Sequence, residues 1–366
     1  MNSQALLTPV KLGDYELKNR VVMAPMTRDR ANNPDLAPTE LHAEYYAQRA
    51  SAGLIVTEGS QVSPQGVGYI YTPGIHSQAQ VEGWKRVTEA VHARGGRIFL
   101  QLWHVGAVSH PDFHGGALPV APSAFNPGAK AYTPAGALKD SVTARALTTA
   151  EVKAIVADFA QGARNALAAG FDGVEIHGAN GYLIEQFLRD SINRRTDEYG
   201  GGIPDRARFL FEVVEAVVKA VGAGKTGVRL SPANTWNSPP DSDNRALYDH
   251  VIAKLSDYGL AYLHLREPAG DVSAILNMVQ DVSGHYRKVY KGTLIINTGY
   301  TREKGNAAIE AGKTDLVAFG VPFIANPDLV ERFRTSAPLA QADQATFYTP
   351  GAKGYTDYPA LRSAAA

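Results

Sequence analysis

The chain has 366 residues, and its 36 basic and 36 acidic residues give a formal net charge of zero. This balance gives the protein no overall electrostatic reason to bind nucleic acid or an anionic membrane. The absence of cysteine excludes disulfides, cysteine-ligated metal centres and a catalytic thiolate.

The N-terminal segment lacks the basic region and apolar stretch of a secretory signal. No apolar run along the chain reaches the ~18 residues that a transmembrane helix needs. We therefore expect a cytoplasmic protein without a membrane partner.

Residues 10–17, VKLGDYEL, predict a small hairpin with a Gly-Asp turn that covers one end of the fold.

Short apolar segments rich in Val, Ile, Leu and Phe alternate with segments of helical period. The apolar segments predict strands at residues 20–26, 54–60, 97–103, 173–177, 227–231, 261–266, 293–297 and 316–320. The periodic segments predict helices at residues 39–50, 80–93, 149–168, 205–220, 245–258, 301–311 and 326–334. Three helix starts carry N-terminal signals, namely Thr149, Asp205 and Asn326.

About eight strand–helix repeats are typical of a TIM (β/α)8 barrel, and we expect one such α/β domain over residues 1–366. Residues 105–147, rich in Pro, Gly, Ala and Ser, predict a long excursion after the third strand. The alternative is an open doubly wound sheet. It would need a Gly-rich turn after the first strand, where the chain instead has TRDRANNPDL.

Several other motifs fit their usual functions poorly. The GAGKTG stretch at residues 222–227 follows a helix and precedes a strand, the reverse of a phosphate-binding loop. The histidines of residues 104–114 have no zinc spacing, so we expect no metal site. Glu175 and Glu267 are a possible glycosidase pair, but carboxylates paired with arginine inside the barrel are the favoured interpretation.

The C-terminal ends of barrel strands carry the active site in this fold. Here these ends are uncharged apart from Glu58 and Arg229, and they are rich in amide and aromatic side chains. They contain no nucleophile–base pair. This composition favours binding a planar heterocycle, and the glycines after the last two strands suit a phosphate group.

Long stretches of the chain resemble the Old Yellow Enzyme family of FMN-dependent ene-reductases. The resemblance is to the branch of the N-ethylmaleimide and pentaerythritol tetranitrate reductases, and it extends from about residue 10 to residue 361. The matching stretches include LKNRVVMAPMTR, AGLIVTEGSQVS, GRIFLQLWHVG, GFDGVEIHGANGYLIEQFLRDSINRRTDEYGG and LVAFGVPFIANPDL.

The resemblance implies a set of FMN contacts. Thr27 would donate a hydrogen bond to the flavin O4, and Gln101 would bind the pyrimidine edge. Arg229 would lie near N1 and O2, where reduction places negative charge. The remaining contacts would come from Ala24, Pro25, Met26, Thr298, Gly299, Gly320 and Val321.

The resemblance also implies the catalytic residues. His177 and Asn180 would donate hydrogen bonds to the substrate oxygen, and Tyr182 would protonate the α-carbon. Aromatic side chains would line the substrate pocket at Tyr69, Trp103 and Tyr355.

The function implied is reduction of the activated C=C bond of α,β-unsaturated carbonyls and related electron-poor alkenes by NADPH or NADH. The cycle would be ping-pong, with one pocket that accepts the nicotinamide and then the alkene. The protein would be a monomer or homodimer. Three alternatives remain: a reductase of nitrate esters or nitroaromatics, a flavin-free phosphate-binding lyase, and a flavin-binding sensor without turnover.

In many relatives an arginine follows the glycine at position 320, where this chain has Val321. We therefore expect weaker FMN retention than in those relatives.

Overall fold

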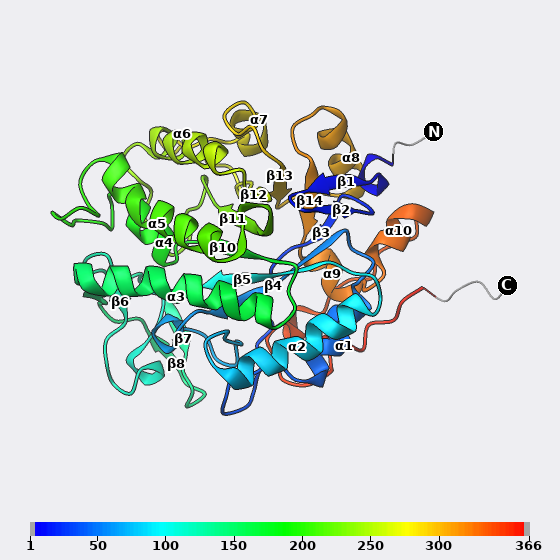
Figure 1. Ribbon diagram of the computed structural model, residues 1–366, viewed down its shortest axis with the longest axis horizontal. Helices are drawn as coiled ribbons and strands as arrows, with labels where there is room; N and C mark the ends of the chain where they lie inside the picture. The colour runs from blue at the N-terminus through cyan, green and yellow to red at the C-terminus, as the bar shows by residue number, and fades with distance from the viewer. Residues whose placement is uncertain (1–3, 362–366) are drawn as a thin grey trace.

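The computed structural model describes residues 4–361 as a closed barrel of eight parallel strands. The strands follow one another around the barrel in chain order (Figure 1). Their bounds are β3 Val21–Met23, β4 Leu54–Gln61, β5 Ile98–Trp103, β10 Gly173–Gly178, β11 Thr226–Leu230, β12 Tyr262–Arg266, β13 Leu294–Asn297 and β14 Leu316–Phe319. Each predicted strand overlaps one of these, so the barrel prediction is confirmed and the open sheet is excluded.

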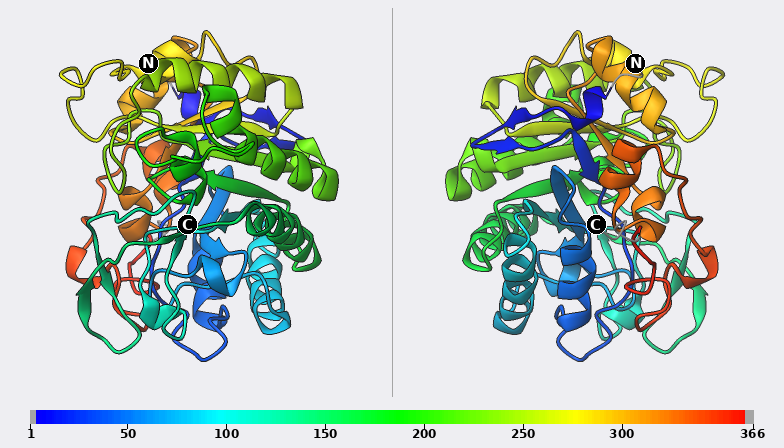
Figure 2. Two further views of the ribbon diagram at one scale, coloured as in Figure 1. Left: turned by 90° about the vertical axis from the view of Figure 1, so that its left-hand side faces the viewer. Right: turned by 90° about the vertical axis from the view of Figure 1, so that its right-hand side faces the viewer.

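Helices surround the barrel (Figures 1 and 2). The longer ones are α1 Glu40–Gln48, α2 Gln78–His92, α3 Thr149–Ala168, α5 Ile203–Val221, α6 Asn244–Leu255, α8 Arg302–Glu310 and α10 Leu329–Thr335. Short helices that the sequence analysis did not predict are α4 Leu183–Leu188, α7 Val282–Tyr286 and α9 Val321–Ala325. Among the described residues, no helix is both long and apolar enough to cross a membrane.

The helix starts differ from the prediction at all three positions. Thr148, not Thr149, caps α3, and its hydroxyl accepts the Glu151 N–H at 3.2 Å. Helix α5 begins before Asp205, which lies in its first turn. Asn326 is the C-cap of α9 and not the N-cap of α10, which is Asp328; the Asn326 amide donates to the carbonyls of Pro322 and Ala340.

The predicted N-terminal hairpin is confirmed. It comprises β1 Val10–Leu12 and β2 Tyr15–Leu17, joined by a turn with Gly13 at φ +53°. Leu12 and Leu17 are buried in one cluster with core residues of the barrel. A Cβ at Gly13 would lie 2.0 Å from the carbonyl oxygen of Gly224, which precedes β11. The hairpin therefore covers the N-terminal end of the barrel and leaves the opposite end for the site.

The excursion over residues 105–147 contains two small sheets. Strand β6 (Val120–Ala121) pairs with β9 (Arg145–Ala146), and β7 (Lys130–Tyr132) pairs with β8 (Leu138–Asp140). Figure 2 shows the excursion and the red C-terminal segment at the same end of the molecule. Tyr132 of the excursion and residues 344–349 line a common cavity.

Candidate active site

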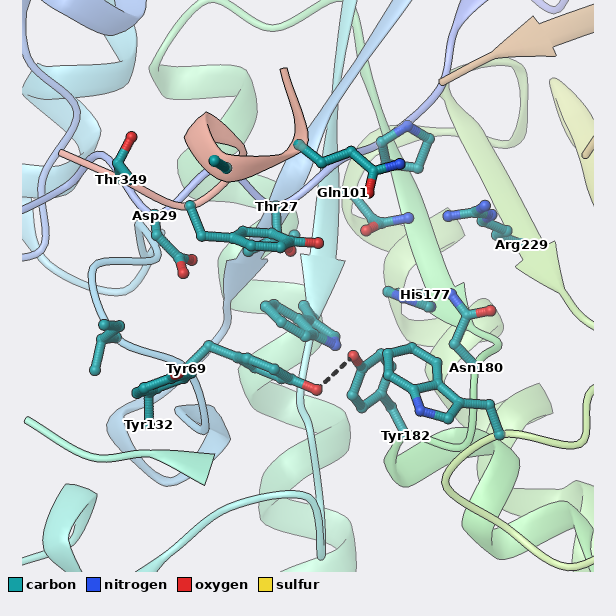
Figure 3. A pocket seen from close by; sticks show the side chains of 18 residues that line it. Thr27, Asp29, Tyr69, Gln101, Tyr132, His177, Asn180, Tyr182, Arg229 and Thr349 are labelled. Carbon is teal, nitrogen blue, oxygen red and sulfur yellow. Dashed lines mark hydrogen bonds between the residues drawn. The ribbon is translucent and has the colours of Figure 1, made fainter. Parts of the chain in front are cut away.

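A cavity of about 620 Å³ opens at the C-terminal ends of the barrel strands (Figure 3). Its walls combine amide, aromatic and few charged side chains. Pro25, Thr27, Gln101, Trp103, His177, Asn180, Tyr182, Arg229 and Tyr69 were all predicted from the sequence and all line it. Side chains of three barrel strands, β5, β10 and β11, and of the loops that follow β3, β4 and β10 therefore meet at one place.

His177 and Asn180 lie where β10 turns toward α4. The Nδ1 atom of His177 accepts the N–H of Ala179 at 3.3 Å, which leaves Nε2 to carry the ring proton. Burial, and after it the charge of Arg229, lower the pKa of His177 well below its usual value, so the ring is neutral at pH 7. The Asn180 Oδ1 atom accepts from Arg266 at 3.3 Å, which leaves the Nδ2 hydrogens for a ligand.

A buried polar network holds this turn in place. Asn180 has a φ of +60°, a conformation that asparagine adopts more readily than most residues. Its N–H donates to the Ser231 hydroxyl at 2.8 Å, and Ser231 donates to Glu185 at 2.7 Å. Glu185 also forms a fully buried ion pair with Arg189. Glu185 and Arg189 belong to the LIEQFLRD stretch and were not predicted as positioning residues.

The Tyr182 hydroxyl lies 3.0 Å from the hydroxyl of Tyr69. Burial raises the pKa of Tyr182 well above its usual value, so the phenol is protonated at pH 7. Its ring meets Trp103 edge to face, with centroids 5.0 Å apart, and Trp103 stacks on Tyr69 at 5.4 Å. Tyr182 is thus a protonated phenol that packs against aromatic rings and faces the cavity.

Arg229 is a buried cation without a carboxylate partner among the described residues. Its Nη2 donates to Asn297 at 3.2 Å, and its Nε has no hydrogen-bond partner in the described part of the chain. The nearby carboxylate of Glu175 is bound by Gln101 at 2.8 Å and by His264 at 2.8 Å. Arg229 therefore offers a positive charge to an electron-rich ligand in the cavity.

The glycosidase interpretation fails on geometry. Glu175 lies fully buried inside the barrel, and its hydrogen-bonded partners are Gln101 and His264 rather than the predicted arginine. The Glu267 carboxylate accepts the N–H groups of Val282 and Ser283, outside this cavity. The two carboxylates do not face a common substrate.

The segments after the last two strands lie at the same end of the barrel. Thr298 and Gly299, after β13, have φ angles of +84° and +78°. Gly320 and Val321 follow β14 at the start of α9, and the Val321 side chain is exposed. Met26 lies beside this turn, 3.5 Å from the position of a Cβ added to Gly320. Ala24 is buried, and its N–H donates to Phe319 at 3.0 Å.

Tyr355 is a correction to the predicted pocket. It is fully buried and stacks on Tyr45 at a centroid distance of 3.9 Å, away from the cavity. Arg28 and Arg30 lie over its ring at 5.1 and 4.9 Å. The C-terminal aromatic residue that lines the cavity is Tyr348. Other lining residues that the sequence analysis did not predict are Asp29, Tyr132, Trp236, Gln344 and Thr349.

Comparison with known proteins agrees with this geometry. Residues 5–340 match the NADH:flavin oxidoreductase / NADH oxidase family. A solved Old Yellow Enzyme homologue from Zymomonas mobilis is 46% identical, covers 98% of this chain and 100% of its own, and superimposes with a TM-score of 0.93. The chain belongs to the Old Yellow Enzyme family. Membership makes it an FMN-dependent oxidoreductase and contradicts the flavin-free lyase alternative.

Other relatives in the Old Yellow Enzyme family are equally similar over their whole length. The rice protein 12-oxophytodienoate reductase 1 is 46% identical over 97% of this chain and 93% of its own. The Arabidopsis thaliana protein 12-oxophytodienoate reductase 2 is 43% identical over 99% and 97%. Morphinone reductase, solved in complex with tetrahydroNAD, is 46% identical over 98% of each chain, with a TM-score of 0.92.

Proposed function

We propose that this protein reduces the activated C=C bond of α,β-unsaturated carbonyl compounds and related electron-poor alkenes, with NADH or NADPH as reductant. One observation carries the proposal: two hydrogen-bond donors, His177 and Asn180, and the protonated phenol of Tyr182 face a single cavity. Donors of this kind stabilise an oxygen that gains negative charge, and a phenol that is still protonated at neutral pH has a proton to give.

The same cavity fits FMN. The buried guanidinium of Arg229, with no carboxylate partner in the described chain, suits the N1–O2 edge of a reduced flavin. Thr27 and Gln101, which line the cavity, would bind O4 and the pyrimidine edge. Ala24, Pro25 and Met26 would lie along the ring system. Bound FMN supplies the hydride-transfer chemistry of both half-reactions.

The phosphate of FMN would lie against backbone N–H groups after β13 and β14. Thr298, Gly299, Gly320 and Val321 would provide this backbone. Thr298 and Gly299 have positive φ angles, and the two glycines have no side chain to block an anion. The exposed Val321 side chain offers no cation there. Phosphate binding through backbone amides alone is weaker than binding that includes a bidentate guanidinium.

Val321→Arg is therefore expected to tighten FMN binding by about tenfold, the scale of one charge-assisted hydrogen bond. Position 321 is exposed at the first turn of α9, so the longer side chain meets no core residue. The dissociation constant is measured by recovery of flavin fluorescence on dilution of the holoenzyme. Leu276→Arg, at a site with 79% exposure, is the control for net charge. Equal FMN affinity in wild type and Val321→Arg would show that position 321 does not face the phosphate.

The substrate would lie with its carbonyl oxygen between His177 Nε2 and Asn180 Nδ2. Hydrogen bonds from both groups withdraw electron density and make the β-carbon electrophilic. Tyr182 would then give its proton to the α-carbon. Tyr69 and Trp103 form the walls, and Tyr348 takes the place expected for Tyr355.

The test of the proposal is an anaerobic absorbance experiment on the purified holoenzyme. NADH or NADPH should bleach the flavin bands, and 2-cyclohexenone added afterwards should restore them and yield cyclohexanone. Bleached bands that return with oxygen but with no activated alkene would contradict alkene reduction. Separate additions of NADH and NADPH identify the preferred reductant.

A further inference from the structure

The cavity contains a carboxyl group that the proposed reaction does not use. Asp29 follows β3 in the loop after Thr27 and lines the cavity. In Figure 3 its carboxylate points into the cavity from the side opposite to Arg229. The cavity thus has a basic end, where the substrate oxygen would lie, and an acidic end.

Asp29 is buried, and its Oδ1 atom has no hydrogen-bond partner in the described chain. The arginines on either side of it point elsewhere. Arg28 donates to the Gly354 carbonyl at 2.7 Å, and Arg30 donates to the Thr346 carbonyl at 2.8 Å. Both guanidinium groups therefore fix the C-terminal segment over the barrel, and within residues 4–361 the Asp29 carboxyl forms no ion pair.

Both the backbone conformation of Asp29 and the burial of its carboxyl are energetically unfavourable. Asp29 has a φ of +55°, in the left-handed region that non-glycine residues rarely adopt. Burial, and after it the charge of Glu58, raise the pKa of Asp29 to about 8, although Arg30 and Arg28 oppose the shift. A buried polar group with no partner in the protein calls for one from outside it, and strained residues cluster at ligand sites.

Three tyrosines surround this end of the cavity. Tyr69 forms one wall, and Tyr132 of β7 and Tyr348 lie at the mouth, where their side chains are about 60% exposed. Burial, and after it the charge of Asp29, raise the pKa of Tyr348, which places the two groups near each other. Tyrosine faces attract cations, and a bound cation favours the ionised form of the Asp29 carboxyl.

We propose that Asp29, Tyr69, Tyr132 and Tyr348 form a subsite for an alkylammonium group carried by the alkene substrate. The inference rests on the proposed function, because the alkene must be held by His177 and Asn180 while its cationic substituent reaches Asp29. The ionised form of Asp29 disfavours substrates that carry a carboxylate at the same position. The subsite determines which electron-poor alkenes the enzyme selects.

The experiment compares three ligands on the FMN-loaded enzyme. They are cyclohexanones substituted at ring carbon 5 with a trimethylammoniomethyl group, with its neutral isostere 2,2-dimethylpropyl, or with a carboxymethyl group. These saturated ketones bind without being reduced, so calorimetry gives their dissociation constants directly. The matching cyclohex-2-enones give kcat/KM for the same series.

Asp29→Asn is the informative variant, because asparagine tolerates a positive φ and keeps the shape of the side chain. Asp257→Asn, which removes an exposed charge near the N-terminal end of β12, controls for net charge. At pH 9, above the pKa of about 8 that burial gives Asp29, wild type and Asp257→Asn should bind the ammonium ligand about tenfold more tightly than the neutral one, the scale of one charge-assisted contact. In Asp29→Asn the two affinities should agree within about twofold.

Two results would overturn the subsite: a wild-type enzyme that binds the neutral ligand as tightly as the ammonium ligand, or an Asp29→Asn variant that keeps the preference. Failure of the proposed function gives a different pattern. All three enones would then go unreduced, while calorimetry still ranks the saturated ligands.

Discussion

Tyr182→Phe should slow alkene reduction by about a hundredfold and leave reduction of the flavin by NADH unchanged, since general-acid groups contribute on that scale. The phenol is buried, protonated at pH 7 and held 3.0 Å from Tyr69. Only the alkene half-reaction needs a proton at carbon. Stopped-flow absorbance separates the two steps, with NADH bleaching the oxidised enzyme and 2-cyclohexenone reoxidising the reduced enzyme.

Tyr69→Phe is the matched comparison for this prediction. This variant removes the Tyr69 hydroxyl, which is hydrogen-bonded to Tyr182, and keeps the ring that stacks on Trp103. We expect alkene reduction to fall by less than about tenfold, because Tyr182 retains its proton. Equal losses in both half-reactions of Tyr182→Phe would contradict its role as proton donor.

His177→Ala should lower kcat/KM for 2-cyclohexenone by about 10²-fold or more, the usual cost of losing one donor to a developing oxyanion. The structure orients the ring for this task, because Nδ1 accepts the Ala179 N–H and Nε2 is left to donate. The donor is neutral, since burial lowers the pKa of His177. The measurement is reoxidation of dithionite-reduced enzyme over a range of enone concentrations.

His177→Asn is the rescue variant for this position. Its side chain keeps an N–H donor, so it should recover part of the activity that His177→Ala loses. Flavin content and the unfolding temperature report whether either variant disturbs the barrel. If His177→Ala reduces the enone at the wild-type rate, the substrate oxygen does not lie between His177 and Asn180.

The barrel was predictable because its strands are buried on both faces. Such strands appear in the sequence as short continuous apolar runs, and helical periodicity marks the segments between them. The side chains of Gln101, His177 and Arg229 were predictable for the same reason, since strands fix their positions. The helix starts were predicted less well. Asn326 precedes a proline, a pattern typical of a helix start, but its side-chain amide donates hydrogen bonds to two carbonyls instead of capping the next helix.

The acidic end of the cavity could not be predicted in this way. Asp29, Tyr132 and Tyr348 come from three segments that lack a regular period, and the folded chain alone brings them together. Tyr355 lies in GYTDYPAL, a further stretch that resembles the family, whereas Tyr348 precedes it. Only the structure shows that Tyr355 stacks on Tyr45 in the core and that Tyr348 lines the cavity.

The central claim is that one cavity accepts the nicotinamide and the alkene in turn. The most direct test is the rate at which NADH reduces the flavin in the presence of increasing amounts of a saturated cyclohexanone that fills the cavity. The account predicts competitive inhibition, with the observed rate approaching zero as the ketone saturates the enzyme. A reduction rate that stays unchanged with the ketone bound would place the nicotinamide elsewhere and contradict the claim.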